Sequence, residues 1–213
     1  MLQIFFSSPA AFLVLASALV ISITIHEFAH AWFADRLGDP TPRSQGRVTL
    51  NPLAHLDPIG TIMILLVGFG WGKPVMFDPY NLKNVRQDVL LIALAGPVSN
   101  IILAFLFTLL LPILPFSPLV WQVVITINLA LAAFNLLPIH PLDGGKIMSG
   151  LLPPRTAVEF DNIMNRYGLL ILLAMLFFPI GNQRPVDLLV RPVMNGLGLT
   201  INWLASLIQG LFF

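Results

Sequence analysis

Two histidines and a glutamate in the first apolar segment are spaced so that they can bind a metal ion and activate water. The run His26-Glu27-Phe28-Ala29-His30 reads H-E-x-x-H. Residues four apart lie on one face of a helix, so both imidazoles can reach one ion, and Glu27 can reach a water molecule on that ion. This pattern is typical of two zinc ligands with a general base. The alternative is that the three side chains only form hydrogen bonds between helices.

A hydrolytic zinc site needs a third protein ligand and an open position for water. The chain has no cysteine, and its other histidines are His55 and His140. The best carboxylate candidate is Asp143, because Pro138 and Pro141 must break the helix just before it. An acid at a broken helix end at membrane depth is expected to line a cavity or to contact a cation. The alternative for Asp143 is a helix cap.

The composition places these residues in a membrane. Of the 213 residues, 57% are hydrophobic and 10% are charged, whereas a soluble domain has about 25% charged residues. This composition excludes a soluble monomer. A net charge of +1 leaves no basic surface for nucleic acid, and the absence of cysteine excludes disulfides and thiolate metal sites.

Several apolar segments are long enough, or nearly long enough, to cross a bilayer about 30 Å thick. They are residues 9–33, 89–111, 119–137, 167–180 and 192–213, of which the last either crosses the membrane or lies along it. The glycine-rich segment 58–71 is too short, and we expect it to be re-entrant or interfacial. Loose alternation at residues 46–50 suggests a strand, and residues 68–80 suggest a re-entrant or edge-strand element.

The fold class predicted is therefore an all-α polytopic membrane protein with about five, or four to six, transmembrane helices. A small β-hairpin or re-entrant element is expected on the cytoplasmic side. If residues 58–71 do not cross, the basic residues before the second span all lie on one side, and those after the third span return to it. They are Arg36, Arg43, Arg47, Lys73, Lys83 and Arg86, and then Lys146, Arg155 and Arg166. The positive-inside rule makes that side cytoplasmic, with His30 and Asp143 toward it.

These motifs resemble those of the site-2 protease family of intramembrane zinc metalloproteases, peptidase family M50. Besides H-E-x-x-H, residues 135–138 and 142–144 match its second motif, N-x-x-P…L-D-G. Residues 95–100, Ala-Gly-Pro-Val-Ser-Asn, match a third element on the helix between them. Together the motifs cover residues 20–150.

The resemblance implies that His26, His30 and Asp143 bind one zinc ion per chain and that Glu27 is the general base. It also implies a three-helix core near the cytoplasmic face. The whole chain is similar to a minimal member without PDZ or CBS domains. We therefore expect a single domain over 1–213, with a catalytic core at about 9–150 and accessory helices at 151–213.

The function expected is an endopeptidase that hydrolyses peptide bonds in transmembrane or membrane-adjacent segments by means of a zinc-activated water. Its partners would be the lipid bilayer and a membrane-anchored protein or peptide, and its location the prokaryotic cell (inner) membrane. Many relatives act in regulated intramembrane proteolysis. Two alternatives are a membrane metal-ion transporter and a non-catalytic zinc-binding scaffold. A transporter needs ionisable groups across the membrane, and a structural zinc site needs no base such as Glu27.

Other polar residues have more than one reading. Asn135 can donate a hydrogen bond to the oxyanion of the reaction or to a neighbouring helix. Asn100 lies on a small-residue stripe with Ala93, Gly96 and Ala104, which favours helix packing over a catalytic role. His140 is expected to be interfacial, with a role beside Asp143 as the alternative, and His55 is expected to bond to loop backbone.

Overall fold

The computed structural model describes residues 6–67, 70–113 and 117–212, and this part of the chain is helical. Its α-helices are α2 (Pro9–Leu37), α3 (Thr41–Ser44), α4 (Pro58–Val67), α5 (Val85–Leu110), α6 (Pro118–Asn135), α7 (Asp143–Leu151), α8 (Pro154–Phe177) and α9 (Pro185–Phe212). Two short 3₁₀ turns, η1 (Pro52–Ala54) and η2 (Pro79–Asn81), lie between α3 and α5.

Four of the described helices, α2, α5, α6 and α8, are long and apolar enough to cross a membrane. The chain is thus an all-helical polytopic membrane protein, as the sequence predicts. The ten-residue α4 is about 15 Å long, roughly half the hydrocarbon thickness. The 28-residue α9 is not among the four candidates.

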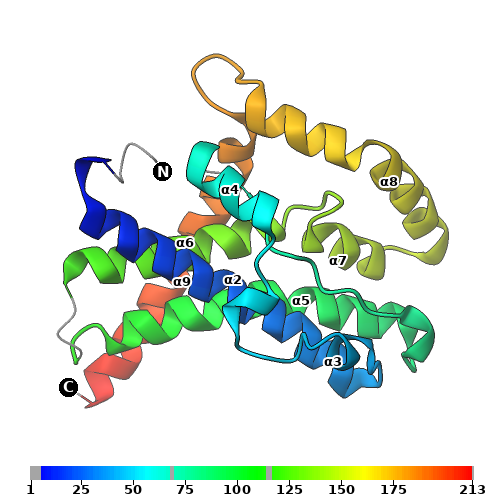
Figure 1. The fold of residues 1–213 in the computed structure, drawn as a ribbon, viewed down its shortest axis with the longest axis horizontal. Coiled ribbons are helices and arrows are strands. Elements are labelled where there is room, and N and C mark those ends of the chain that lie inside the picture. Colours follow the sequence, from blue (N-terminus) through cyan, green and yellow to red (C-terminus); the bar gives the residue numbers. More distant parts are fainter. Residues whose placement is uncertain (1–5, 68–69, 114–116, 213) are drawn as a thin grey trace.

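Helices α2, α5 and α6 form the centre of the molecule, and α9 packs across α5 and α6 (Figure 1). Small side chains lie at the contacts, because Ala34, Ala104 and Ala132 are completely buried. Small residues let helix backbones approach closely where no hydrophobic effect drives association. The short helix α7 packs against α5, and α8 contacts α7 and α9 at the edge of this bundle.

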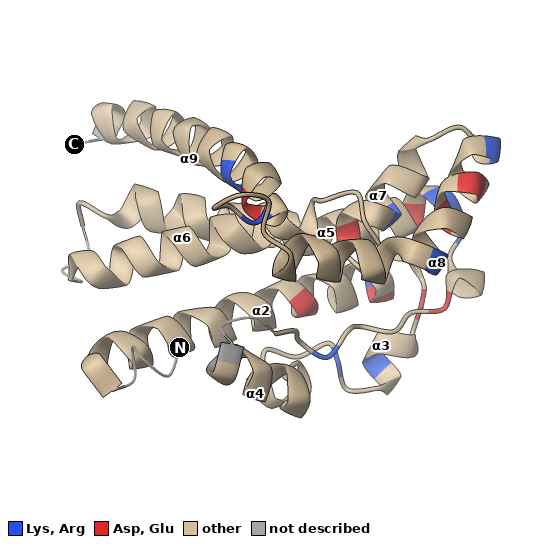
Figure 2. Ribbon diagram, turned by 90° about the horizontal axis from the view of Figure 1, so that it is seen from above, with Lys and Arg blue, Asp and Glu red and all other residues tan. Residues whose placement is uncertain are grey.

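Most of the charged residues gather at one end of the molecule, and others lie on α2 and at the beginning of α9. Figure 2 shows lysine, arginine, aspartate and glutamate around α3, α7 and the beginning of α8, whereas the far ends of α2, α6 and α9 lack them. This distribution follows the charge asymmetry predicted from the sequence.

The strand expected at residues 46–50 is wrong, because turns and bends occupy this stretch. Polar backbone groups in this stretch form hydrogen bonds without pairing to another strand. His55 Nε2–H donates to the Thr49 carbonyl, and the Arg47 amide donates to the Pro42 carbonyl. Among the described residues 70–80, β-structure is limited to an isolated antiparallel bridge between Gly72 and Leu56. Residues 68–69 of the expected re-entrant element lie outside the described residues.

Candidate metal centre

The structure brings His26, His30 and Asp143 to one point. The two histidines lie one turn apart on α2, and Asp143 begins α7. Asp143 Oδ2 is 3.1 Å from His26 Nε2 and 3.2 Å from His30 Nε2, and the two Nε2 atoms are 3.1 Å apart. Within the described chain, this is the group of histidine and carboxylate side chains that could hold a metal ion.

Each imidazole is oriented by a second hydrogen bond. His26 Nδ1–H donates to Asn100 Oδ1 and His30 Nδ1–H donates to the Ile92 carbonyl, both at 2.7 Å. Because both partners accept, both Nδ1 atoms carry the proton and both Nε2 atoms present a lone pair. His26 Nε2, His30 Nε2 and Asp143 Oδ2 therefore direct lone pairs toward one another. This arrangement is favourable when a cation lies between them.

Gly96 on α5 makes room for the two rings. A Cβ atom at this position would lie 2.4 Å from His30 Nε2 and 2.6 Å from His26 Nε2. Any larger residue would displace the imidazoles, so glycine is required here for close approach. Gly96 belongs to the stripe that the sequence assigns to helix packing, and the surface that packs against it is the pair of histidine rings.

The helix break between α6 and α7 places Asp143 next to the two histidines. Leu142 occupies the N-cap of α7 without a side-chain capping bond, so the alternative of Asp143 as a helix cap is wrong. A Cβ at Gly144 would lie 2.2 Å from the Leu137 carbonyl oxygen. This glycine therefore allows α7 to begin directly against the end of α6.

Glu27 lies beside this cluster, close to a buried arginine. Its Oε2 is 3.8 Å from Arg47 Nη2, and the Arg47 side chain is 3% exposed. Arg47 Nη1 donates to the Ala54 carbonyl at 2.6 Å, and Nη2 donates to the Lys73 carbonyl. Burial lowers the pKa of the Arg47 guanidinium from its ordinary value, and the Glu27 carboxylate partly opposes this. The sequence indicated nothing special about Arg47, which reads as one of several loop cations.

Comparison with known proteins identifies the family. The Bacillus subtilis protein named "Putative zinc metalloprotease YwhC" is 41% identical over 180 residues, covering 79% of this chain and 82% of YwhC. The model of "Peptidase family M50" matches residues 115–175. The chain belongs to peptidase family M50. It is accordingly an intramembrane zinc metalloendopeptidase.

Two further relatives have lower identity over about the same length of this chain. "Putative zinc metalloprotease Rip2" of Mycolicibacterium smegmatis is 29% identical over 182 residues, which is 81% of this chain and 70% of Rip2. "Zinc metalloprotease MJ0392" of Methanocaldococcus jannaschii is 25% identical over 182 residues, which is 83% of this chain and 46% of MJ0392. No solved structure matches the chain significantly.

The donor atoms of this M50 chain fit a zinc ion. Zinc binds histidine nitrogen and carboxylate oxygen at about 2.0–2.2 Å in tetrahedral geometry, so two ligand atoms on one ion lie roughly 3.3–3.5 Å apart. The distances among the three atoms, 3.1–3.2 Å, are close to this. Two histidines and one aspartate also leave the fourth position open, as in catalytic rather than structural zinc sites.

The cluster opens into a cavity of about 640 Å³, which is lined by the predicted residues His26, Glu27, His30 and Asp143. One wall is the extended segment Gly70–Phe77, from which Trp71, Val75 and Phe77 line the cavity. Another part of the lining comes from leucines of α8, namely Leu169, Leu172, Leu173 and Leu176. A long, mostly apolar ligand with one polar group at the metal would suit this lining.

Asparagines play different parts around the site. Asn135 lines the cavity, but its Nδ2 donates to the Leu131 carbonyl at 3.0 Å. Asn100, which accepts from His26, also donates to Asn128 Oδ1 at 2.9 Å. Asn100 thus forms hydrogen bonds between helices, in agreement with the expected role in helix packing, and it also orients the His26 imidazole. The signal available was its place in the third motif, one turn after Gly96.

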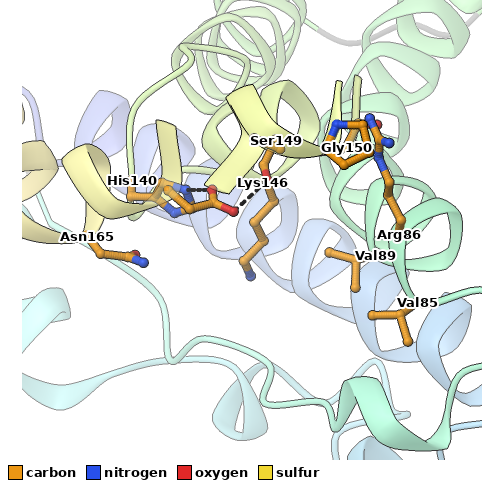
Figure 3. A pocket seen from close by; sticks show the side chains of 11 residues that line it. Val85, Arg86, Val89, His140, Lys146, Ser149, Gly150 and Asn165 are labelled. Carbon is orange, nitrogen blue, oxygen red and sulfur yellow. Dashed lines mark hydrogen bonds and ion pairs between the residues drawn. The ribbon is translucent and has the colours of Figure 1, made fainter. Parts of the chain in front are cut away.

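His140 lies in a second cavity of about 470 Å³ (Figure 3). Its Nε2 is 3.2 Å from Asp161 Oδ1, and Ser149 Oγ donates to Asp161 Oδ2 at 2.7 Å. His140 is not in the metal-binding group, so its alternative role beside Asp143 is not supported. Lys146 lines both cavities and thus marks the boundary between them.

Proposed function

We propose that this peptidase cuts transmembrane or membrane-adjacent segments of membrane-anchored proteins with His26, His30 and Asp143 as zinc ligands and Glu27 as the general base. The observation that carries this proposal is the convergence of three lone-pair-bearing ligand atoms from two distant helices. A bound zinc ion supplies Lewis acidity and lowers the pKa of water to about 7.

The chain's own residues then hold the reactants and move the proton. The bonds to Asn100 and Ile92 fix the two imidazoles. Glu27, which lines the same cavity, accepts the proton of the attacking water and delivers it to the leaving amine. Asn135 is positioned at the cavity to donate to the carbonyl oxygen of the substrate once its amide turns away from the Leu131 carbonyl.

The substrate must be extended at the scissile bond, and Gly70–Phe77 is the element that could hold it. Val75 makes no backbone hydrogen bond within the described chain and lines the cavity, so its peptide groups are available for β-pairing. Lys73 differs, because its amide donates to the His55 carbonyl at 2.7 Å. Lys73→Pro would thus disturb the fold as well, and Val75→Pro is the cleaner test. Val75→Pro should impair cleavage with zinc retained; unchanged cleavage would remove this part of the proposal.

We place the active site toward the cytoplasm of a prokaryotic cell membrane. The gathering of charged residues at the end that carries α3 and α7 supports this orientation by the positive-inside rule (Figure 2). We also propose that residues 1–213 work as one domain, with the core at about 9–150. The leucines of α8 in the cavity wall give the region 151–213 a part in the site.

Metal analysis together with a cleavage assay tests the function. Purified wild-type protein should hold one zinc ion per chain and cut model transmembrane substrates, and His26→Ala and Asp143→Ala should lose both properties. Glu27→Gln should keep zinc and lose cleavage. Fully active Glu27→Gln would contradict the base assignment. Metal uptake into proteoliposomes by Glu27→Gln would instead support transport, the competing function.

A further inference from the structure

The Arg47 guanidinium joins two separate segments above the metal centre. Its two terminal nitrogens donate to the carbonyls of Ala54 and Lys73. Ala54 ends the short turn η1, and Lys73 lies in the Gly70–Phe77 wall of the cavity. The guanidinium fork suits such a cross-link because its donors have fixed directions. Together with the backbone hydrogen bond from the Lys73 amide to the His55 carbonyl, the Arg47 side chain therefore ties the wall to the preceding loop.

Arg47 and Glu27 are also charge partners. A guanidinium stays protonated, and a buried charge is costly unless it is paired. Within the described chain, Glu27 is the carboxylate that forms an ion pair with Arg47. The Glu27 carboxylate in turn makes no hydrogen bond to any other described residue. The position of its carboxylate is thus set largely by this cation.

Gly72 brings the same wall against the glutamate. A Cβ atom at Gly72 would lie 3.7 Å from Glu27 Oε1, 3.1 Å from the His55 carbonyl oxygen and 3.0 Å from Ile23 Cγ2. The wall thus lies directly over α2 at the level of Glu27. Moving it would change both the space for the carboxylate and the path of a bound peptide.

We propose that Arg47 is a positioning residue of the peptidase, which holds the Gly70–Phe77 wall over α2 and orients the Glu27 carboxylate toward the cavity. Arg47 does not touch substrate or metal; it acts through Glu27 and through the Lys73 carbonyl. The proposal rests on the proposed role of Glu27. If Arg47 does not position Glu27, this can be distinguished from an error in the role of Glu27 as the base, because the thermal test needs neither zinc nor activity.

The kinetic test compares Arg47→Met and Arg47→Lys with the wild type. Both variants should retain stoichiometric zinc, since Arg47 contacts none of the three ligands. Arg47→Met should lower kcat by about 100-fold, the size expected when a reacting group is misplaced by about 1 Å, with a smaller change in KM. Arg47→Lys keeps the charge beside Glu27 and should recover part of kcat.

Arg43, in the preceding short helix α3, provides the matched control. It is exposed and pairs with Asp35 at 2.6 Å, so Arg43→Met removes an arginine and an ion pair without touching the site. Exposed ion pairs contribute little, and Arg43→Met should keep wild-type kcat, KM and zinc. A loss of kcat in Arg43→Met equal to that in Arg47→Met would overturn the proposal.

A thermal double-mutant cycle on the zinc-free protein tests the coupling directly. Glu27→Gln should lower the melting temperature in detergent by about 2–4 °C when Arg47 is present, because the buried guanidinium loses its anion. In the Arg47→Met background, and in part in Arg47→Lys, the same change should have little or no effect. An equal effect of Glu27→Gln in all backgrounds would show that the two residues are uncoupled and would refute the proposal. That result would leave the zinc ligands and the base assignment untouched.

Discussion

Gly96→Ala should separate metal binding from folding. The added methyl carbon would lie 2.4 Å from His30 Nε2 and 2.6 Å from His26 Nε2 and Cε1. Ordinary contact between such atoms needs about 3.5 Å, so the rings must move by roughly 1 Å. Ligand positions in a metal site tolerate only about 0.2 Å. We therefore expect the affinity for zinc to fall by at least 100-fold and cleavage to be lost.

The cost to folding should be much smaller than the cost to metal binding. Alanine is favoured over glycine within a helix by up to ~1 kcal/mol, which offsets part of the ~1–3 kcal/mol that overpacking costs. The assay is a competition titration of zinc against a chromophoric chelator, run beside thermal unfolding of the zinc-free protein.

Gly196→Ala is the control, because it makes the same change within α9 where, apart from the neighbouring residues and backbone of the helix itself, no described atom lies within 4 Å of the new methyl group. It should keep zinc affinity and cleavage and gain slightly in stability. A Gly96→Ala protein with wild-type zinc affinity would refute the argument, since the imidazoles could then not lie where the added methyl group must go.

Three further predictions concern polar contacts. Asn100→Ala should weaken zinc binding by about 10- to 100-fold by releasing His26, as measured by the same titration, whereas Asn100→Asp keeps an acceptor and should bind more tightly than the alanine variant. Burial alone raises the pKa of Asp39, but hydrogen bonds from neighbouring groups outweigh it and hold that pKa below its usual value; the stability Asp39 contributes is therefore complete above the unfolded-state pKa of about 4 and lost as the pH falls below it. Melting temperatures between pH 6 and pH 3 should fall less steeply in Asp39→Asn, and equal slopes would contradict this. Asp161→Asn should loosen α8 at modest cost, about 1 kcal/mol or less, seen as faster proteolysis of the α7–α8 connection with zinc affinity unchanged.

Local patterns in the sequence predict much of the site. The spacing of His26 and His30 alone places them on one helix face, and the prolines before Asp143 predict the helix break that frees this acid to meet them. The apolar runs predict the spanning helices. All these features depend on neighbours close in sequence, which periodicity can reveal.

Contacts between distant segments explain what could not be predicted. Arg47 reads as a surface cation because its carbonyl partners and Glu27 lie in three other segments. The alternation at residues 46–50 suggests a strand, but hydrogen bonds from the loop satisfy the backbone there instead. Gly96 matches a motif, yet the identity of the atoms that require its missing side chain emerges only when α2 and α5 are packed.

The order in which the metal-binding atoms leave the ribosome follows from their places in the chain. Asp143 lies 117 residues after His26 and 113 after His30. A nascent chain thus inserts its first helix, with both imidazoles and the glutamate, long before the aspartate is synthesised. During that interval the two imidazoles have no Asp143 carboxylate beside them, so all three side chains cannot yet hold one metal ion together.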